Sequence, residues 1–307
     1  MILFNSITDG VRQVKKNWRI IFIFYTVNLL LALLITLPLQ SALTETVGQS
    51  LAGRQLLKEF NLAFIYEFLH QQPLTASQLI QNLFYFSLVF VFVQTFLLGG
   101  TIKVFYARKQ SFSPMFFFTG CLEYFTRFLK LFFVWFGIFI ILILFHFFVG
   151  VLIKHFTKSI ENEITILWLT LVRLGLLLMA MLLVNLCLDY AKIITVSDDL
   201  PKILPALKVS ARFVFRHFGQ TVLLYGMIGL VGIMAVVIYW PFSGWLQFES
   251  GLSIALVFLV RQIFVLFRLG IRLVFYSAQQ HFYVKHSFTP PPEDNDFYPD
   301  ENEILLA

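Results

Sequence analysis

Six apolar runs dominate the sequence, and each is long enough to cross a lipid bilayer. They lie at residues 18–39, 79–106, 125–153, 164–189, 220–242 and 252–276. A bilayer core holds no water to pair with backbone N–H and C=O groups, so a run of about 20 apolar residues crosses it as a helix. The composition agrees, with 59% hydrophobic and 13% charged residues. The sequence therefore predicts an all-α, polytopic membrane protein with six transmembrane helices.

Basic residues are unevenly distributed among the segments that connect these runs. The N-terminal segment and the second and fourth connections are rich in lysine and arginine, whereas the fifth connection has neither. Basic residues concentrate on the cytoplasmic side of membrane proteins, so the asymmetry predicts that both termini are cytoplasmic. The same topology accounts for the net charge of +6 without a nucleic-acid partner.

The composition changes abruptly near residue 287. Residues 1–286 are predicted to form a single helical membrane domain, whose first span is too long for a signal-peptide core. Residues 287–307 contain three consecutive prolines and six acidic residues, and this composition predicts a disordered, acidic cytoplasmic tail. A protein partner that binds the tail is an open alternative. Cys121 and Cys187 fall near predicted cytoplasmic helix ends, so we expect free thiols.

A repeated unit organises the membrane domain. A mixed basic and apolar segment precedes the first, third and fifth spans, at residues 7–18, 118–130 and 204–218, and a tyrosine-containing stretch follows each even-numbered span. Three copies of an interfacial helix plus a transmembrane hairpin predict a pseudo-threefold bundle. The interfacial helices present candidates for contact with anionic lipid headgroups. These candidates are Lys15, Lys16, Arg127, Lys130, Arg212 and Arg216. Alternatively, these residues only satisfy the positive-inside rule.

Several short motifs carry a family resemblance. They are Val196-Ser197-Asp198-Asp199, Ala206-Leu207 and Ser210 within residues 190–218, together with Asn17-Trp18 and Gly99-Gly100. In these the chain resembles bacterial six-helix integral membrane proteins of unknown function, which are similar to the membrane domain attached to some glycerophosphodiester phosphodiesterases. The resemblance implies a fold and a location in the bacterial inner (plasma) membrane. It transfers no catalytic residue, because the sequence contains no soluble phosphodiesterase domain.

Four arginines within the predicted spans are candidates for an anion- or lipid-headgroup-binding site. Arg261, Arg268 and Arg272 share one helical face of the sixth span, and Arg173 lies as deep in the fourth span as Arg261 does in the sixth. Charge within a membrane is costly and needs a partner, a cavity or a lipid phosphate. Internal pairing of Arg173 and Arg261 is the alternative, with candidate partners Glu123, Asp189, Gln94 and Asn185. Arg268 and Arg272 are near enough to the inner surface to snorkel.

Glycines and one histidine receive structural interpretations. Gly226, Gly229 and Gly232 in the fifth span, and Gly99 and Gly100 in the second, are predicted to let helices approach closely. His146 has no second ligand at helical spacing, so no metal site is proposed. Residues 55–70 are predicted to form an amphipathic helix that caps the outer face.

No catalytic, nucleotide-binding or cofactor-binding motif is present, so we expect no cofactor. The first functional hypothesis is a non-enzymatic membrane protein that organises anionic lipid or partner proteins through its basic interfacial helices. The second is a transporter or channel for an anionic or lipid-like substrate that uses the mid-membrane arginines. The third, a membrane-embedded enzyme that modifies lipid, requires Asp198, Asp199 and His217 to gather around a pocket.

Overall fold

The computed structural model describes residues 2–47, 66, 70, 73–108, 112–156, 163–245 and 251–287. Helices are the only regular secondary structure in these ranges. They are α1 (Ile2–Lys16), α2 (Arg19–Val47), α5 (Pro73–Tyr106), α6 (Pro114–Phe156), α7 (Glu163–Ser197), α8 (Ile203–Arg216), α9 (Phe218–Trp245) and α10 (Gly251–His286). The all-α prediction is confirmed. The predicted amphipathic helix at 55–70 falls outside the described residues apart from Tyr66 and His70, and the tail from 288 onward also falls outside them.

Five helices are long and apolar enough to cross a membrane, which gives a multi-pass membrane protein. The candidate segments are Arg19–Pro38, Ser77–Tyr106, Pro114–Phe156, Ile164–Ser197 and Phe218–Trp240. They match the first five predicted spans. The helix α10 contains the predicted sixth span but is not among the five. Its 36 residues extend over roughly 54 Å, so its length suffices to cross a bilayer.

The three basic segments fold in two different ways. Asn17 ends α1 by donating its side-chain amide to the carbonyl of Gln13 at 3.0 Å, and His217 separates α8 from α9. The segment 118–130, by contrast, is part of one continuous helix, α6. No proline or turn residue interrupts the chain between Gly120 and Gly137, so the helix continues from the basic segment into the apolar run. Residues 118–130 are thus helical, as predicted, but they are continuous with the third span and do not form a distinct interfacial helix.

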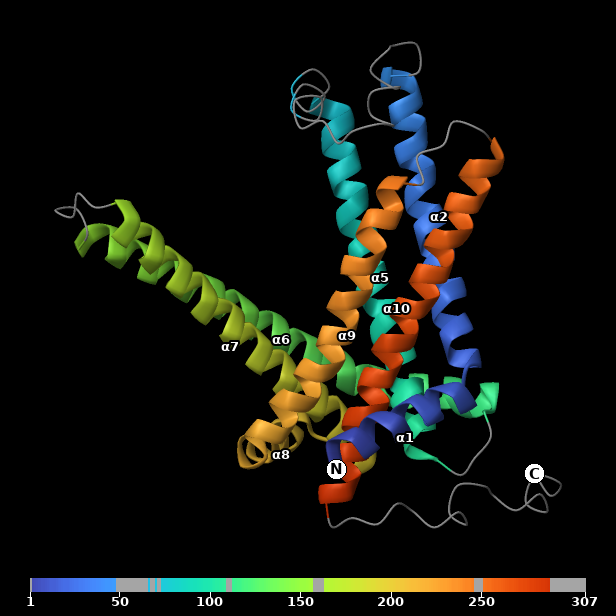
Figure 1. The fold of residues 1–307 in the computed structure, drawn as a ribbon, viewed down its shortest axis with the longest axis vertical. Helices are drawn as coiled ribbons and strands as arrows, with labels where there is room; N and C mark the ends of the chain where they lie inside the picture. The colour runs from blue at the N-terminus through green and yellow to red at the C-terminus, as the bar shows by residue number, and fades with distance from the viewer. Residues whose placement is uncertain are drawn as a thin grey trace.

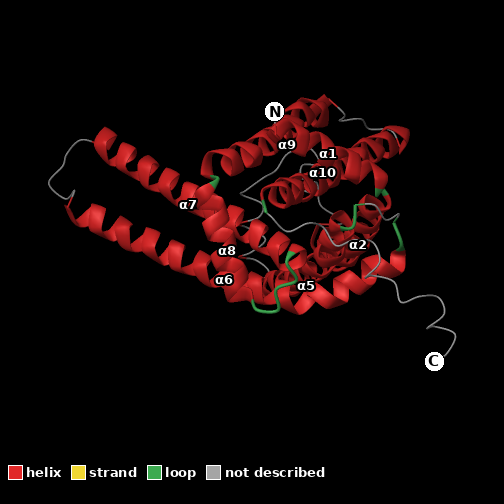
Figure 2. Ribbon diagram, turned by 90° about the horizontal axis from the view of Figure 1, so that it is seen from below, coloured by secondary structure: helices red, strands yellow, loops and turns green. Residues whose placement is uncertain are grey.

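The helices form two arms that diverge from a common base. One arm contains α2, α5, α9 and α10, and the other is the hairpin α6–α7, which projects away from the first arm (Figure 1). Seen from below, α6 and α7 again extend together to one side (Figure 2). The three hairpins therefore do not close into the pseudo-threefold bundle that the repeat predicted. Instead α10 is the central helix, which contacts α1, α2, α5, α7 and α9.

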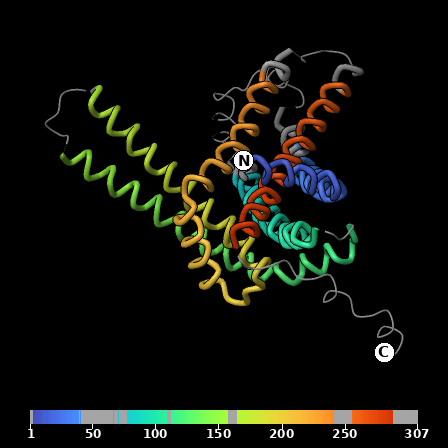
Figure 3. The backbone as a smooth tube through the Cα atoms, turned by 60° about the horizontal axis from the view of Figure 1, so that its bottom comes forward, coloured from blue at the N-terminus to red at the C-terminus, as the bar shows by residue number. Residues whose placement is uncertain are grey.

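The buried core lies at the base where the arms meet, and we call it the hub. It comprises the last turns of α5, the first turns of α6, the ends of α7 and α10, and much of α8, together with the end of α1 and the first turns of α2 and α9. Figure 3 shows α1 beside the C-terminal part of α10 at this base. Tyr190, Phe117 and Phe282 are fully buried here. Most large side chains on the arms are exposed, as expected for surfaces that contact lipid.

Close helix approach in the hub depends on glycine. A Cβ at Gly99 would lie 3.0 Å from the Gly120 carbonyl oxygen, and one at Gly100 would collide with the carbonyl oxygen of Phe117. The prediction that Gly99 and Gly100 let helices approach closely is therefore confirmed, at the crossing of α5 and α6. For Gly226, Gly229 and Gly232 it is not, because among the described residues no atom outside the local backbone of α9 lies within 4 Å of a Cβ placed at any of them.

Candidate functional site

A cavity of 280 Å³ lies where the two arms separate, and we call it the central cavity. Residues from α5, α6, α7 and α10 form its walls. One part of the wall is aromatic and aliphatic, with Phe90, Phe132 and Trp135. The other part is polar and charged. It consists of Gln94, Thr95, Asn185, Asp189, Lys192, Arg272 and Tyr276.

Two separate sets of hydrogen bonds connect polar side chains of the wall across five helices. Arg272 of α10 donates from Nη1 to Oε1 of Gln94 at 3.0 Å, and Gln94 of α5 donates in turn to Asn28 of α2 at 2.6 Å. The indole Nε1 of Trp135 donates to Oδ1 of Asn185 at 2.6 Å, which links α6 to α7. These bonds orient Gln94, Arg272 and Asn185, as a pre-organised binding site requires.

The charges around the central cavity do not balance. Lys192 pairs with Asp189 at 2.9 Å on the same helix. Arg272 is hydrogen-bonded to the neutral amide of Gln94, so its charge has no ion-pair partner among the described residues. The wall thus holds two cationic groups and one carboxylate. An uncompensated cation in a partly desolvated cavity favours binding of an anion.

Two further cavities adjoin the central cavity and are mostly apolar. A groove of 910 Å³ runs between α9 and α10 and shares Phe90, Asp189, Arg272 and Tyr276 with the central cavity. We call it the α9–α10 groove. Gly229 and Gly232 line it, so these glycines leave space in the groove where the sequence predicted close packing.

The second adjoining cavity lies within the α6–α7 hairpin and measures 230 Å³. It shares Trp135 and Asn185 with the central cavity and is otherwise lined by Phe139, Leu142, Met181 and Val184. The three spaces together place a charged centre between two apolar extensions.

The four candidate arginines are not gathered in one site. Arg272 lies in the central cavity, and Arg268 lines the α9–α10 groove. Arg261 is exposed, without a hydrogen-bond or ion-pair partner in the described part of the chain. Arg173 packs against Gly150 of α6, and its Nε is buried without a partner among the described residues. Arg173 and Arg261 lie on helices that diverge (Figure 1).

The side chains predicted to pair with Arg173 and Arg261 have other partners. Asp189 pairs with Lys192, Glu123 with Lys103 at 2.6 Å, and Asn185 with Trp135. Gln94 accepts a hydrogen bond from Arg272. The sequence had instead predicted that the Arg272 side chain extends to the inner membrane surface. The sequence signal that could have indicated Arg272 is the presence of Asn28 and Gln94, two amides within neighbouring apolar spans.

The six interfacial candidates divide into two groups. Lys15, Lys130, Arg212 and Arg216 are exposed in the hub region and remain open to lipid. Two others make structural contacts. Lys16 donates to the carbonyl of Arg108 at 2.7 Å, and Arg127 donates to Asp199 at 2.6 Å and to the carbonyl of Leu200.

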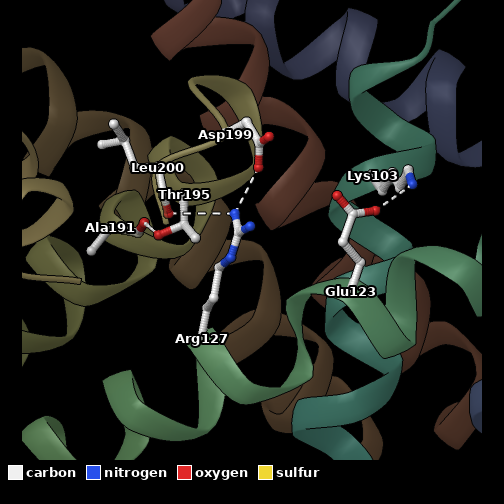
Figure 4. Close-up of polar contacts among 7 residues, drawn as sticks. All are labelled: Lys103, Glu123, Arg127, Ala191, Thr195, Asp199 and Leu200. Carbon is white, nitrogen blue, oxygen red and sulfur yellow. Dashed lines mark hydrogen bonds and ion pairs between the residues drawn. The ribbon is translucent and has the colours of Figure 1, made fainter. Parts of the chain in front are cut away.

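Figure 4 shows how two of these ion pairs connect different helices. Arg127 of α6 points to the turn that joins α7 to α8, where Asp199 has a positive φ of 42°. Lys103 of α5 reaches Glu123 of α6 near the glycine crossing. Arg127 thus positions the α7–α8 turn.

We expect the pair Arg127–Asp199 to contribute modestly to stability. Asp199 has a side-chain exposure of 68%, so solvent screens the pair, and exposed pairs contribute about 0.5 kcal/mol. A double-mutant cycle with Arg127→Ala and Asp199→Ala, read from free energies of unfolding in micelles, measures the coupling. A coupling above about 2 kcal/mol would show that the turn is far less solvated than its exposure indicates.

The residues required by the enzyme hypothesis are engaged separately. Asp198 accepts a hydrogen bond from the Tyr283 hydroxyl at 2.8 Å, and burial raises the pKa of its carboxyl, against the effect of that bond. Asp199 pairs with Arg127, and the His217 ring lies 5.0 Å from that of His286. No cluster of three metal-ligating side chains occurs in the described ranges. Cys121 and Cys187 are both free thiols.

Comparison with known proteins identifies no relative of this chain. No family model, curated protein or solved structure matches this chain.

Proposed function

We propose that this protein binds an amphiphile with an anionic headgroup, of the membrane-lipid class, without catalytic turnover. The observation that carries the proposal is the position of Arg272, whose guanidinium is held by a neutral amide within a cavity that has apolar extensions. A guanidinium offers several donors in a fixed plane, so it can bind Gln94 and a phosphate oxygen together.

The shape of the site supports an amphiphile over a small ion. The headgroup occupies the central cavity, beside Arg272 and Lys192. The acyl chains occupy the α9–α10 groove, where Ile233 and Phe264 are among the apolar lining residues, and the cavity within the α6–α7 hairpin. A small inorganic anion would leave these apolar spaces without an occupant.

The proposed arrangement in the membrane places the hub on the cytoplasmic side of a bacterial inner membrane, with α10 as a sixth span and both termini cytoplasmic. The distribution of basic residues supports this orientation. The central cavity then lies at the level of the inner leaflet, and the divergence of the arms offers lipid a lateral route into it (Figure 1). A lipid transporter would use the same binding site and would in addition release the lipid elsewhere.

The exposed basic residues of the hub suit a second, weaker contact with lipid. Lys15, Arg212 and Arg216 project from α1 and α8, which have one apolar and one polar face. Such helices lie in the headgroup layer and attract anionic lipid. They would increase the concentration of anionic lipid near the entrance.

The proposal predicts that Arg272→Gln weakens binding of anionic lipid. Loss of a hydrogen bond made by a charged group lowers affinity by about tenfold or more. The experiment measures retention of phosphatidylglycerol and of phosphatidylcholine by the purified protein in neutral detergent, by native mass spectrometry. We expect phosphatidylglycerol to be retained preferentially by the wild type and largely lost from the variant.

Arg261→Gln is the matched control, because Arg261 lies on the same helix but lines neither the central cavity nor the α9–α10 groove. It should retain phosphatidylglycerol as the wild type does. Equal losses in both variants would indicate a general effect of charge and would contradict the assignment to Arg272. The absence of any preference for the anionic lipid would refute the proposed function.

A further inference from the structure

A second charged pocket lies in the hub, away from the central cavity. It is formed by α1, the residues that follow α5, and the last turns of α10, and we call it the basic pocket. Two adjoining spaces of 540 and 210 Å³ make up the pocket, and both are lined by Asp9, Arg12, Arg108 and His281. Close packing of α1 on α10 shapes it, since a Cβ at Gly10 would lie 3.0 Å from the backbone nitrogen of Ala278.

Basic groups outnumber acidic groups around the basic pocket. Among the described residues of its lining, Asp9 is the one carboxylate, against Arg12, Arg108, His281 and Lys285. Asp9 is shared, with one oxygen 3.1 Å from Nε2 of His281 and the other 3.7 Å from Arg12. A single carboxylate cannot neutralise all these groups, so the pocket has a net positive charge.

The pocket also holds a buried hydrogen-bond donor that no described residue satisfies. The backbone of Arg108 is fixed by Lys16, which donates to its carbonyl at 2.7 Å. Burial lowers the pKa of Arg108, although Asp9 opposes the effect. The side-chain nitrogen of Gln13 is buried without a hydrogen-bond partner in the described residues. Guanidinium, ammonium and amide donors around one space suit a ligand with several anionic oxygens.

We propose that the basic pocket is a binding site for an oxyanion of the phosphate class, either free or as the headgroup of a lipid. Arg108 and Lys285 provide the charge, and His281 responds to the bound anion. The site is separate from the central cavity, since the two share no lining residue.

His281 links anion binding to pH. Its Nδ1 lies 3.3 Å from the Ser6 hydroxyl, and its Nε2 faces Asp9. Burial lowers the pKa of His281, Arg108 and Lys285 lower it further, and Asp9 acts in the opposite direction. A bound dianion favours the imidazolium and raises this pKa, so binding takes up a proton. Affinity must then increase as the pH falls through the range in which His281 titrates.

The test uses the full chain in neutral detergent and measures binding of sulfate and inorganic phosphate by isothermal titration calorimetry. Sulfate is the probe for pH dependence, because it does not titrate between about pH 8 and about pH 5.5. We expect sulfate affinity to rise by up to about tenfold on acidification, for a pKa shift of one unit. Arg108→Gln should reduce affinity by about tenfold, and His281→Gln should remove the pH dependence.

Lys285→Gln is a second variant that cannot disturb the core, because Lys285 is exposed near the end of α10. It should weaken sulfate binding severalfold, whereas Lys208→Gln, at an exposed position of α8 outside the pocket, should not. A parallel titration with a short-chain phosphatidic acid identifies the source. If Arg108→Gln weakens binding of both the inorganic anions and the phosphatidic acid, the site is open to free anions. If it weakens binding of the phosphatidic acid alone, the site binds a lipid headgroup. Failure of all probes to bind, or binding unaffected by Arg108→Gln and Lys285→Gln, overturns the proposal.

Discussion

Gly100→Ala is expected to destabilise the fold by about 3 kcal/mol, although it adds a single methyl group. The added Cβ would collide with the carbonyl oxygen of Phe117 and lie 2.6 Å from Sγ of Cys121. The first of these atoms belongs to the backbone of α6, so neither a rotamer change nor a small side-chain shift relieves the contact. The helices α5 and α6 must separate at this close crossing. Tryptophan fluorescence during unfolding in mixed micelles with increasing denaturing detergent measures the change.

Gly226→Ala is the matched control for this prediction. A Cβ at Gly226 meets no atom of another described residue within 4 Å beyond the local backbone of its own helix, so the substitution adds no overlap. Alanine is the better helix former, so stability should stay the same or rise by up to about 1 kcal/mol. If Gly100→Ala were as stable as Gly226→Ala, the close crossing of α5 and α6 would be excluded.

The second large effect is expected for Asp189→Asn, with a loss of about 3 kcal/mol. The Asp189 carboxylate lies 2.9 Å from the Lys192 ammonium, and their side-chain exposures are 14% and 23%. Removing the carboxylate leaves Lys192 without its ion-pair partner in a cavity that also contains Arg272. A mostly desolvated charge with no partner is costly, and a second cation nearby adds repulsion.

Two comparisons separate this effect from a general loss of charge. Asp199→Asn removes a carboxylate that is 68% exposed, and it should cost less than about 1 kcal/mol. The double replacement Asp189→Leu with Lys192→Leu removes both charges, and it should recover most of the stability lost in the single variant. If Asp189→Asn and Asp199→Asn cost the same, the Asp189–Lys192 pair is solvated and the central cavity is more open than the structure indicates. Unfolding in mixed micelles again provides the measurement.

Hydropathy predicted the helices well because the requirement is local. Each apolar run must satisfy its own backbone hydrogen bonds in a bilayer, and the first five predicted spans coincide with helices apolar enough to cross one. Helix ends were harder to predict. The helix that contains the fourth span does not end at the tyrosine-containing stretch that follows this span, because α7 continues to Ser197. In the same way, α10 continues past the sixth span to His286. Packing in the hub stabilises these added turns, since Tyr190 and Phe282 are fully buried there.

The candidate site was only partly predictable. Arg272 was identified as a candidate by its unusual position in an apolar segment, and the structure places it in the central cavity. Its partner could not be inferred, because Gln94 is 178 residues away in the chain. Equal depth suggested that Arg173 and Arg261 belong together, but the divergence of the arms places them on different parts of the molecule (Figure 1). Depth is a single coordinate and carries no information about lateral position.

The sequence alone determined that this is a helical, multi-pass membrane protein, where most of its spans lie, and that Gly99 and Gly100 permit a close crossing of helices. These properties depend on hydrophobicity and residue size over short stretches of chain. Only the tertiary structure decided that the α6–α7 hairpin diverges and that Gly229 and Gly232 line an open groove. It also decided that Arg272, instead of Arg173 or Arg261, faces a cavity with apolar extensions. These outcomes depend on contacts between helices far apart in the sequence, and the residue pattern of one helix does not specify which neighbour it meets.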